Sequence, residues 1–440
     1  MRRKGEKLYI KAKKIIPGGN QLLSKRPEMF LPKLWPSYYK KSKDIKIWDL
    51  NNRCYEDFSI MSIGQCSLGY SNREVNIAVT RAINSGSTST LNSEEEVKLA
   101  DSLIKIHNGM DMVRFGKTGG EACAMAVRIA RASTGRSKII ASGYFGWHDW
   151  YLASNLKNKK SLDNLLLPGL DTAGVPKELR GTTLALKYGD IKNLKKLFYK
   201  NGKSIAGIIV EVQRSRVPNL EFLKLARKLC NKYKSVLIFD EVSSGFRINL
   251  GALYLNYNLN PDIVILGKAL GNGFPISAVM GKKNIMEAAQ GTFISSSYWT
   301  ERTGFVAGLE TLKQYKKNNV GKYLKNVGNY FDKKFKSLSL DLKLNFENNG
   351  LISVPIITFN SGSKLLDLQI KTFLTQEMLK RGYIFSNAIY LSFKHNKKNI
   401  NRFFDNFYEV LRKDHKNFSP KFFKKKLKGP VCHSGFKRLT

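Results

Sequence analysis

Acidic residues are scarce in this sequence. Its 440 residues contain 34 Asp and Glu against 75 Lys and Arg, which gives a formal net charge of +41. A charge of this size is compatible with nucleic acid or an anionic membrane as a partner. The lysines are spread along the whole chain, however, and only residues 421–428 form a dense basic cluster with aromatics. Because no helix-turn-helix, RNA-recognition or zinc-finger signature accompanies that cluster, we expect a solvated basic surface and no specific nucleic-acid binding.

Cysteine and long apolar segments are scarce too. The five cysteines are scattered and contain no Cys-x-x-Cys pair, so they indicate neither a disulfide framework nor a zinc site. They are Cys54, Cys66, Cys123, Cys230 and Cys432. The strongest apolar runs, such as residues 236–239 and 263–266, fall far short of the roughly 20 residues that a membrane-spanning helix needs. The basic N-terminus lacks the apolar segment of a secretory signal, so we expect a cytoplasmic protein with no membrane attachment.

The order of the apolar segments predicts an α/β fold. From residue 76 onward, apolar strands alternate with amphipathic helices, a pattern typical of a mainly parallel sheet covered by helices on both faces. One helix start carries a predicted capping box, Ser93 with Glu96. We expect a large domain over residues 76–315 and a smaller α+β domain that combines residues 1–75 with residues 316–440. The expected strands of the large domain cover residues 137–142, 205–212, 235–242 and 261–266.

Two carboxylates directly follow the apolar run at 236–239. An acid such as Asp240 or Glu241 at the end of a buried strand needs a cationic partner, or it keeps its proton. A nucleotide-bound magnesium ion is one such partner. A nucleotide site of this kind requires the phosphate-binding motif Gly-x-x-x-x-Gly-Lys-Ser/Thr. Gly-Lys-Thr at 116–118 fits the end of this motif, but Asp111 stands where its first glycine belongs, so the motif is absent. The protonated ring nitrogen of pyridoxal phosphate is the other candidate.

Pyridoxal phosphate requires a lysine for a Schiff base, an acid for the ring nitrogen, an anion site and an aromatic face. Lys268 follows the expected strand 261–266 on a glycine-rich turn, and Asp240 supplies the acid at the end of another strand. Residues 118–120 lie at a helix start, where free N–H groups and the helix dipole favour a phosphate. Tyr144 follows a further strand and can stack on the ring. The sequence therefore predicts a pyridoxal-phosphate site.

The sequence IFDEVSSGFR at 238–247, combined with PDIVILGKALGNGFPISAVMG at 261–281, resembles the class III aminotransferases, which are fold type I pyridoxal-phosphate enzymes. Within that family the sequence is most similar to the glutamate-1-semialdehyde 2,1-aminomutases and their relatives. The resemblance covers nearly the whole chain from Ile16 onward. It implies the fold type I architecture, pyridoxal 5'-phosphate as the cofactor, and a homodimer with a shared active site.

The resemblance also assigns roles at the cofactor ring. By this resemblance Lys268 forms the Schiff base and Asp240 keeps the ring nitrogen protonated. Val242 packs under the ring, and Tyr144 stacks above it. Phe145 stands where the family often has histidine, which is a departure from the pattern.

For the cofactor phosphate, the resemblance assigns Thr118, Gly119 and Gly120, together with Ser297 of the neighbouring subunit. A hydroxyl residue commonly occupies the place of Gly120 in the family, so one side-chain contact is lost here. Ser297 replaces a more usual threonine. The segment 295–305 around it is longer than the corresponding loop of typical members, which weakens any transfer of substrate specificity.

The substrate leaves fewer signals in the sequence. Ser24 and Arg26 match the region that binds the substrate carboxylate in the aminomutases, and arginine suits a carboxylate through its two-pronged geometry. A solvated loop arginine is the alternative in so basic a chain. Trp35, Trp147 and His148 are candidates either for the pocket wall or for the core.

Three functions follow from these observations. The first is an aminotransferase that moves an amino group between an amino acid or amine donor and an aldehyde or ketone acceptor. The second is an intramolecular aminomutase, which uses the same residues but keeps its intermediate bound. The third is a nucleic-acid-associated protein without catalytic activity, which would be colourless and show salt-dependent retention on DNA or RNA.

Overall fold

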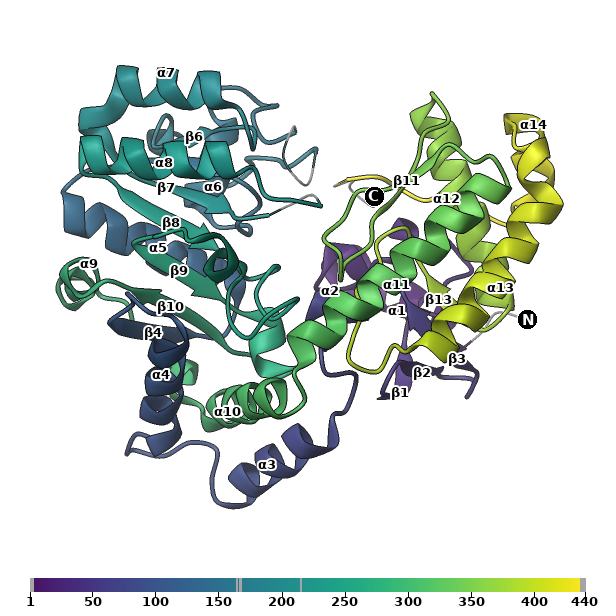
Figure 1. Ribbon diagram of the computed structural model, residues 1–440, viewed down its shortest axis with the longest axis horizontal. Coiled ribbons are helices and arrows are strands. Elements are labelled where there is room, and N and C mark those ends of the chain that lie inside the picture. Colours follow the sequence, from purple (N-terminus) through teal and green to yellow (C-terminus); the bar gives the residue numbers. More distant parts are fainter. Residues whose placement is uncertain (1–3, 164, 166–167, 214–215, 436–440) are drawn as a thin grey trace. The chain divides into compact units, whose positions relative to one another are not determined.

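Two units make up the chain in the computed structural model, which describes residues 4–163, 165, 168–213 and 216–435 (Figure 1). Unit 1 combines Met1–Asn72 with Lys322–Thr440, and unit 2 is the continuous segment Arg73–Gly321.

A seven-stranded sheet forms the centre of unit 2, in the order β4-β10-β9-β8-β7-β5-β6. The pairs from β9 to β6 are parallel, whereas β10 pairs antiparallel with both β9 and β4. The mainly parallel sheet that we expected from the sequence is therefore confirmed. The strands are β4 (Met112–Gly116), β5 (Lys138–Ser142), β6 (Thr183–Ala185), β7 (Ile205–Glu211), β8 (Val236–Asp240), β9 (Ile263–Leu266) and β10 (Ser277–Gly281).

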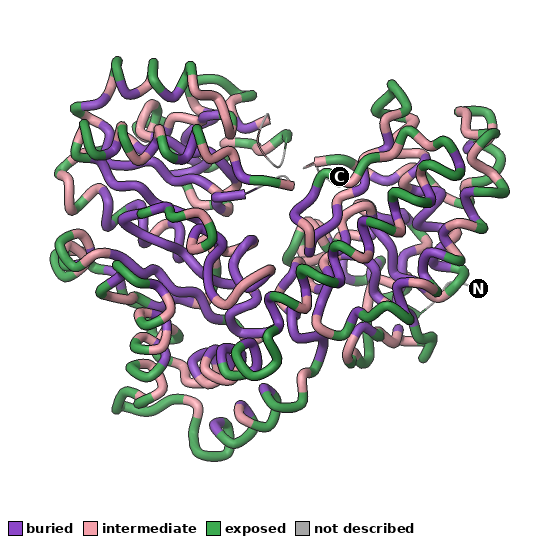
Figure 2. The backbone as a smooth tube through the Cα atoms, in the orientation of Figure 1, coloured by how far each residue is buried: buried purple, intermediate pink, exposed green. Residues whose placement is uncertain are grey.

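Helices cover this sheet because its central strands are apolar on both faces. Every residue of β8 and β9 is buried, and Figure 2 shows these strands enclosed by more exposed helices. Ile209 of β7, Ile238 of β8 and Ile265 of β9 share one hydrophobic cluster with the buried side of α5. Because side chains alternate along a strand, the residues next to them face the other side of the sheet. The helices of unit 2 are α3 (Arg73–Asn84), α4 (Glu94–Ile106), α5 (Gly119–Thr134), α6 (Asp149–Leu152), α7 (Ile191–Asn201), α8 (Leu220–Tyr233), α9 (Lys283–Met286) and α10 (Arg302–Lys317).

Unit 1 joins the two ends of the chain in one sheet, of order β1-β2-β3-β13. The C-terminal strand β13 pairs in parallel with β3, so the expected small domain built from both termini is confirmed. Phe58 of β3 stacks on Phe403 of α13 at a centroid distance of 4.2 Å, in the centre of an aromatic core. The strands are β1 (Tyr39–Lys43), β2 (Lys46–Asp49), β3 (Cys54–Phe58), β11 (Phe346–Asn348), β12 (Ile357–Phe359) and β13 (Tyr383–Phe385). The helices are α1 (Lys4–Ile15), α2 (Met61–Gly64), α11 (Val320–Asp341), α12 (Lys364–Lys380), α13 (Lys397–Asp414) and α14 (Pro420–Lys426).

The predicted capping box at Ser93 and Glu96 is wrong. Helix α4 does begin after Ser93, but the Ser93 side chain makes no capping hydrogen bond, and the N–H of Glu96 donates to the backbone carbonyl of Ser93 at 3.3 Å. A box with the same spacing forms instead at the start of α5, between Thr118 and Glu121.

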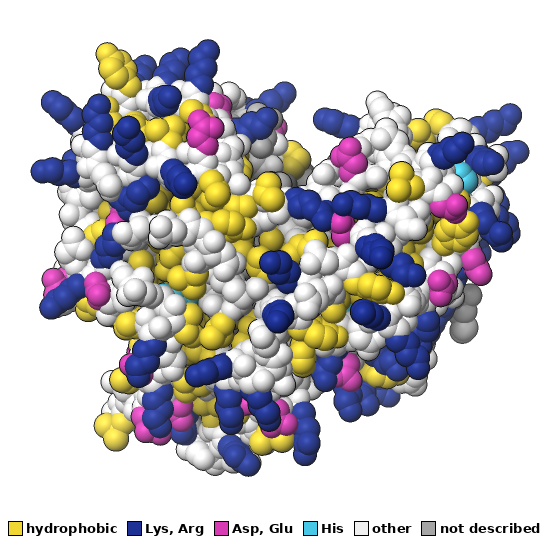
Figure 3. All heavy atoms as spheres, in the orientation of Figure 1, with side chains coloured by type: hydrophobic (Ala, Val, Ile, Leu, Met, Phe, Trp, Pro, Cys, Tyr) yellow, Lys and Arg dark blue, Asp and Glu magenta, His cyan; other side chains and the backbone are white. Residues whose placement is uncertain are grey.

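The surface is rich in basic side chains. On the face that Figure 3 shows, Lys and Arg are distributed over both units. Within the described part of the chain, no helix combines the length and the apolar character that a membrane crossing requires.

Candidate active site

Asp240 and Lys268 lie at the same edge of the sheet. Strands β8 and β9 are parallel neighbours with Asp240 opposite Ile265, and Lys268 follows the end of β9 after Gly267. The Asp240 side chain is buried, and the residue is 6% exposed. In sheets of this kind, ligands bind beyond the carboxyl ends of the strands. The structure therefore brings the predicted acid and the predicted lysine to the edge where a ligand is expected.

The carboxylate of Asp240 is buried and takes part in few hydrogen bonds. Its Oδ1 accepts the N–H of Val242 at 2.8 Å, and its Oδ2 accepts the thiol of Cys123 at 3.6 Å. No ion pair to Asp240 occurs among the residues that the structure describes. Burial and, to a smaller extent, the nearby carboxylate of Glu211 raise the pKa of Asp240 to about 7, although Lys268 and the two hydrogen bonds partly oppose this shift. A cationic group beside Asp240 would hold it ionised at neutral pH.

The amine of Lys268 is held by a neighbouring hydroxyl. Its Nζ donates to Ser243 Oγ at 2.5 Å. Burial lowers the pKa of Lys268, while Asp240 and Glu211 partly oppose this shift. Its backbone φ of 41° is uncommon for a residue other than glycine, and such conformations concentrate at functional sites. A lowered pKa increases the share of neutral amine, which is the form that attacks a carbonyl or takes up a proton.

The start of α5 offers an anion site with a defined set of donors. Thr118 Oγ1 accepts the N–H of Glu121 at 3.3 Å, and Glu121 Oε2 accepts the N–H of Thr118 at 2.7 Å. These two backbone donors are therefore already used. Among the described residues, the N–H groups of Gly119 and Gly120 have no acceptor. The two glycine amides and the Thr118 hydroxyl thus remain as donors to an anion.

Val242 links this helix start to the lysine turn. A Cβ atom placed on Gly119 would lie 2.9 Å from Val242 Cγ1, and one placed on Gly267 would lie 3.4 Å from the same atom. Gly119 therefore allows a closer approach to Val242 than another residue would, and Gly267 lies within van der Waals reach of the same side chain. The predicted phosphate turn, the predicted lysine turn and the predicted floor of the ring lie next to one another.

Tyr144 belongs to the same edge of the sheet. Its N–H donates to Glu211 Oε2 at 3.1 Å, and Glu211 lies opposite Asp240 in the register of β7 and β8. Burial raises the pKa of Tyr144, so its phenol stays neutral near pH 7. The next residue, Phe145, is 1% exposed and packs against Tyr151 in the core.

Ser297 is exposed, although its loop is anchored to the phosphate turn. Trp299 Nε1 donates to Glu121 Oε1 at 3.3 Å. Lys117 Nζ, next to the turn, forms an ion pair of 2.9 Å with Glu301 Oε2, and both side chains are largely buried. The longer segment of this chain is therefore fixed by contacts that the sequence analysis did not anticipate.

Ser24 and Arg26 belong to unit 1, so their role toward a substrate stays a prediction. Ser24 lies in the short helical turn 23–25, and Arg26 follows it. Trp35 is a core residue of unit 1, since it is 8% exposed and stacks on Phe30 at a centroid distance of 4.4 Å.

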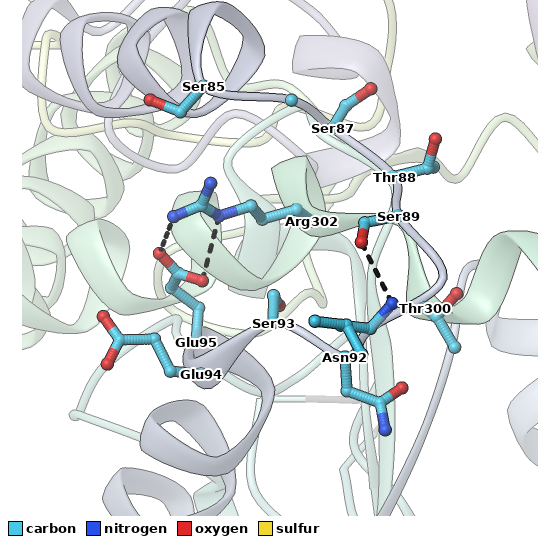
Figure 4. Close-up of a pocket in the computed structure, with 12 residues that line it drawn as sticks. Ser85, Ser87, Thr88, Ser89, Asn92, Ser93, Glu94, Glu95, Thr300 and Arg302 are labelled. Carbon is cyan, nitrogen blue, oxygen red and sulfur yellow. Dashed lines mark hydrogen bonds and ion pairs between the residues drawn. The ribbon is translucent and has the colours of Figure 1, made fainter.

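A polar pocket of about 280 Å³ lies at the starts of α4 and α10 (Figure 4). Hydroxyl side chains line much of it, and the guanidinium of Arg302 donates to both carboxylate oxygens of Glu95, at 2.7 and 3.0 Å. None of the predicted site residues lines this pocket, and we assign it no catalytic role.

The sequence analysis missed Glu211 and Cys123 and left Glu241 without a role. Glu211 ends β7 just as Asp240 ends β8, so an acid after an apolar run could have marked it. Cys123 carries no local signal beyond burial on the inner side of α5. Glu241 is fully buried and accepts hydrogen bonds from the Ser244 hydroxyl and from the N–H of Tyr254, so it stabilises the loop after β8.

Comparison with known proteins gives consistent matches. The family model for class III aminotransferases matches residues 32–345. A glutamate-1-semialdehyde 2,1-aminomutase of Wigglesworthia glossinidia brevipalpis is 32% identical over 92% of this chain and 97% of its own length. A 3-aminobutyryl-CoA aminotransferase of Cloacimonas acidaminovorans is 28% identical over 89% of this chain and 93% of its own length. The structure of an omega-transaminase from Sphaerobacter thermophilus has the same fold, with a TM-score of 0.82 at 23% identity, over 93% of this chain and 97% of that one.

Proposed function

Because the chain belongs to the class III aminotransferase family, we propose that it moves an amino group between an amino acid or amine and an aldehyde or ketone, with Lys268 and Asp240 at the reacting atoms. The cofactor of this enzyme is pyridoxal 5'-phosphate. When bound, this cofactor withdraws electrons from the carbon that carries the amino group. One observation carries the assignment of residues: Asp240 ends β8, and Lys268 follows the adjacent parallel strand β9, at one edge of the sheet.

The residues at this edge fit the cofactor. The buried Asp240 forms no ion pair among the described residues, and a protonated ring nitrogen would supply one. The free N–H groups of Gly119 and Gly120 at a helix start suit a phosphate. Gly119 and Gly267 both lie next to Val242, the predicted floor of the ring.

Lys268 has two tasks in this proposal. Its amine would hold the cofactor aldehyde and, when free, would move the proton at the substrate carbon. The lowered pKa of Lys268 supports both tasks, since each of them needs the neutral amine. Ser243 accepts a hydrogen bond from this amine and so keeps it near the end of β8.

Asp240 keeps a proton on the ring nitrogen in this proposal, which requires its carboxylate to be ionised. Hydrogen bonds from Val242 and Cys123 favour the ionised form and act against the effect of burial. Tyr144 would cover the face of the ring opposite Val242, and its backbone N–H is held by Glu211.

The hydrogen bond from Cys123 is expected to lower the pKa of Asp240. Cys123→Ala removes a donor to the carboxylate, so it should favour neutral Asp240 and lower kcat by about tenfold, the effect of one hydrogen bond to a charged group. Cys123→Ser keeps a donor and should stay within about threefold of wild type. The absorbance of the bound cofactor against pH reports the protonation independently, and its midpoint should shift in Cys123→Ala only.

The matched control is Cys230→Ala, because Cys230 is equally buried but lies in α8. An equal loss of activity in Cys123→Ala, Cys123→Ser and Cys230→Ala would show that packing, and not the hydrogen bond, explains the effect.

The aminomutase is the second candidate, because the relatives include enzymes of both kinds. A screen of amino donors and acceptors separates the two. We expect sustained turnover only when an amino donor and a carbonyl acceptor are both present. Complete conversion of a single substrate without any acceptor would instead identify an aminomutase. Ser24 and Arg26 are proposed to bind the carboxylate of the substrate.

We also propose a cytoplasmic homodimer whose second subunit supplies Ser297 to the phosphate. The exposure of Ser297 supports this arrangement, because its hydroxyl is available to another chain. Large apolar side chains in the same unit are exposed as well, including Phe293 at 89%, Leu91 at 80% and Tyr298 at 73%. A second copy of the chain would cover them.

A further inference from the structure

The space beside Gly120 is occupied by a histidine. A Cβ atom placed on Gly120 would lie 3.0 Å from Cε1 and 3.2 Å from Nδ1 of His148. The imidazole therefore fills the volume into which a longer side chain at position 120 would project. This is the position at which we noted the loss of a hydroxyl side chain.

Two glycines bring the histidine loop to the helix start. Gly146 has a φ of 98°, which favours glycine, and a Cβ atom on it would lie 3.1 Å from the Cα of Gly120. The ring of His148 also stacks on Trp147, with centroids 4.7 Å apart and planes 20° apart. The imidazole thus contacts both its own loop and the helix start.

One polar atom of this imidazole is unsatisfied. His148 Nδ1 is buried and has no hydrogen-bond partner among the described residues. A buried polar atom without a partner costs free energy, which a ligand with the matching group recovers. The N–H groups of Gly119 and Gly120, which mark an anion site, belong to the helix start that this imidazole contacts.

The neutral form of His148 can donate a hydrogen bond from Nδ1. Burial lowers the pKa of His148, although Glu121 and Asp149 raise it, so the ring is mainly neutral near pH 7. A neutral imidazole carries a proton on one of its two nitrogens, and a phosphate oxygen at Nδ1 selects the form that is protonated there.

We propose that His148 binds the phosphate of the cofactor through Nδ1–H and takes the place of the side-chain hydroxyl that Gly120 lacks. This inference rests on the proposed function, because it requires the cofactor phosphate to lie at residues 118–120. Gly120 and His148 then act together, because the glycine leaves space for the imidazole and the imidazole donates the hydrogen bond.

The test measures cofactor affinity of the cofactor-free protein, by absorbance or fluorescence titration with pyridoxal phosphate and with pyridoxal, which has no phosphate. His148→Ala should raise the Kd for pyridoxal phosphate by about tenfold or more and leave the Kd for pyridoxal unchanged. Gly120→Thr alone should also weaken binding, because its side chain meets the imidazole. The double variant Gly120→Thr/His148→Ala should recover a Kd within about threefold of wild type, since a hydroxyl replaces the imidazole.

His107→Ala is the control, because it removes a buried imidazole of unit 2 that is not a predicted site residue. His148→Gln is a further variant that keeps a donor, and its Kd should lie between those of wild type and His148→Ala. An unchanged Kd for pyridoxal phosphate in His148→Ala, or an equal loss for pyridoxal, would overturn the role of His148 and leave the proposed function standing. A wild-type chain that binds neither compound would overturn both.

Discussion

Replacement of Lys268 by alanine is expected to abolish covalent attachment of the cofactor and to lower kcat by about 10⁴-fold, the upper range for loss of a catalytic acid or base. The reason is that the same amine would bind the cofactor covalently and move the proton at the substrate carbon. Lys268 is the lysine that follows β9 beside Asp240, with a lowered pKa and a hydrogen bond to Ser243. Steady-state kinetics with the donor and acceptor found in the screen measure kcat, and the absorbance of the bound cofactor measures the attachment.

The control for this variant is Lys283→Ala, because Lys283 also lies shortly after a strand of the same sheet but has an exposed side chain. It should behave as wild type in both measurements. A Lys268→Ala enzyme with more than about a tenth of the wild-type kcat would be inconsistent with a catalytic base at this position.

Asp240→Asn is expected to lower kcat by about 10²- to 10³-fold, the range for loss of one electrostatic stabiliser in an active site. An amide cannot balance the charge of a protonated ring nitrogen, so the cofactor withdraws electrons less well. The Kd of pyridoxal phosphate should change much less than kcat, because the phosphate and the covalent bond to Lys268 are unaffected. A fully active Asp240→Asn enzyme would refute the role of Asp240.

The same variant should be more stable than wild type in the cofactor-free form. The pKa of Asp240 is raised to about 7 in the folded chain, from an ordinary value of 3.8. A raised carboxyl pKa removes stability as pH increases from about 4 to 7, at about 1.4 kcal/mol per pKa unit. Urea unfolding should therefore show a gain for Asp240→Asn at pH 8 that shrinks toward pH 5. A gain that does not depend on pH would exclude this explanation.

The sequence was sufficient for the residues that follow buried strands. An apolar run such as 236–239 specifies a central strand, and a charged residue directly after it must lie at the sheet edge. For this reason Asp240 and Lys268 could be placed together before the structure was known. The helix start at Thr118 could also be predicted from the sequence, because two glycines there lead into an amphipathic helix.

Contacts between distant segments could not be predicted in this way. Ser93 with Glu96 and Thr118 with Glu121 have the same spacing, but only the second pair forms a capping box, which also binds Trp299. Nothing in either local pattern distinguishes the two, because the choice depends on the tertiary neighbours of each helix start. The contact of His148 with Gly120 was hidden for the same reason.

The central claim is that Lys268 carries the cofactor. Borohydride reduction of the protein loaded with pyridoxal phosphate, followed by proteolysis and mass spectrometry, tests it most directly. We predict a single pyridoxyl group on the peptide that contains Lys268, and none on that peptide after mild release of the cofactor before reduction. A modified lysine elsewhere with an unmodified Lys268, or a protein that stays colourless with added pyridoxal phosphate, would contradict the account.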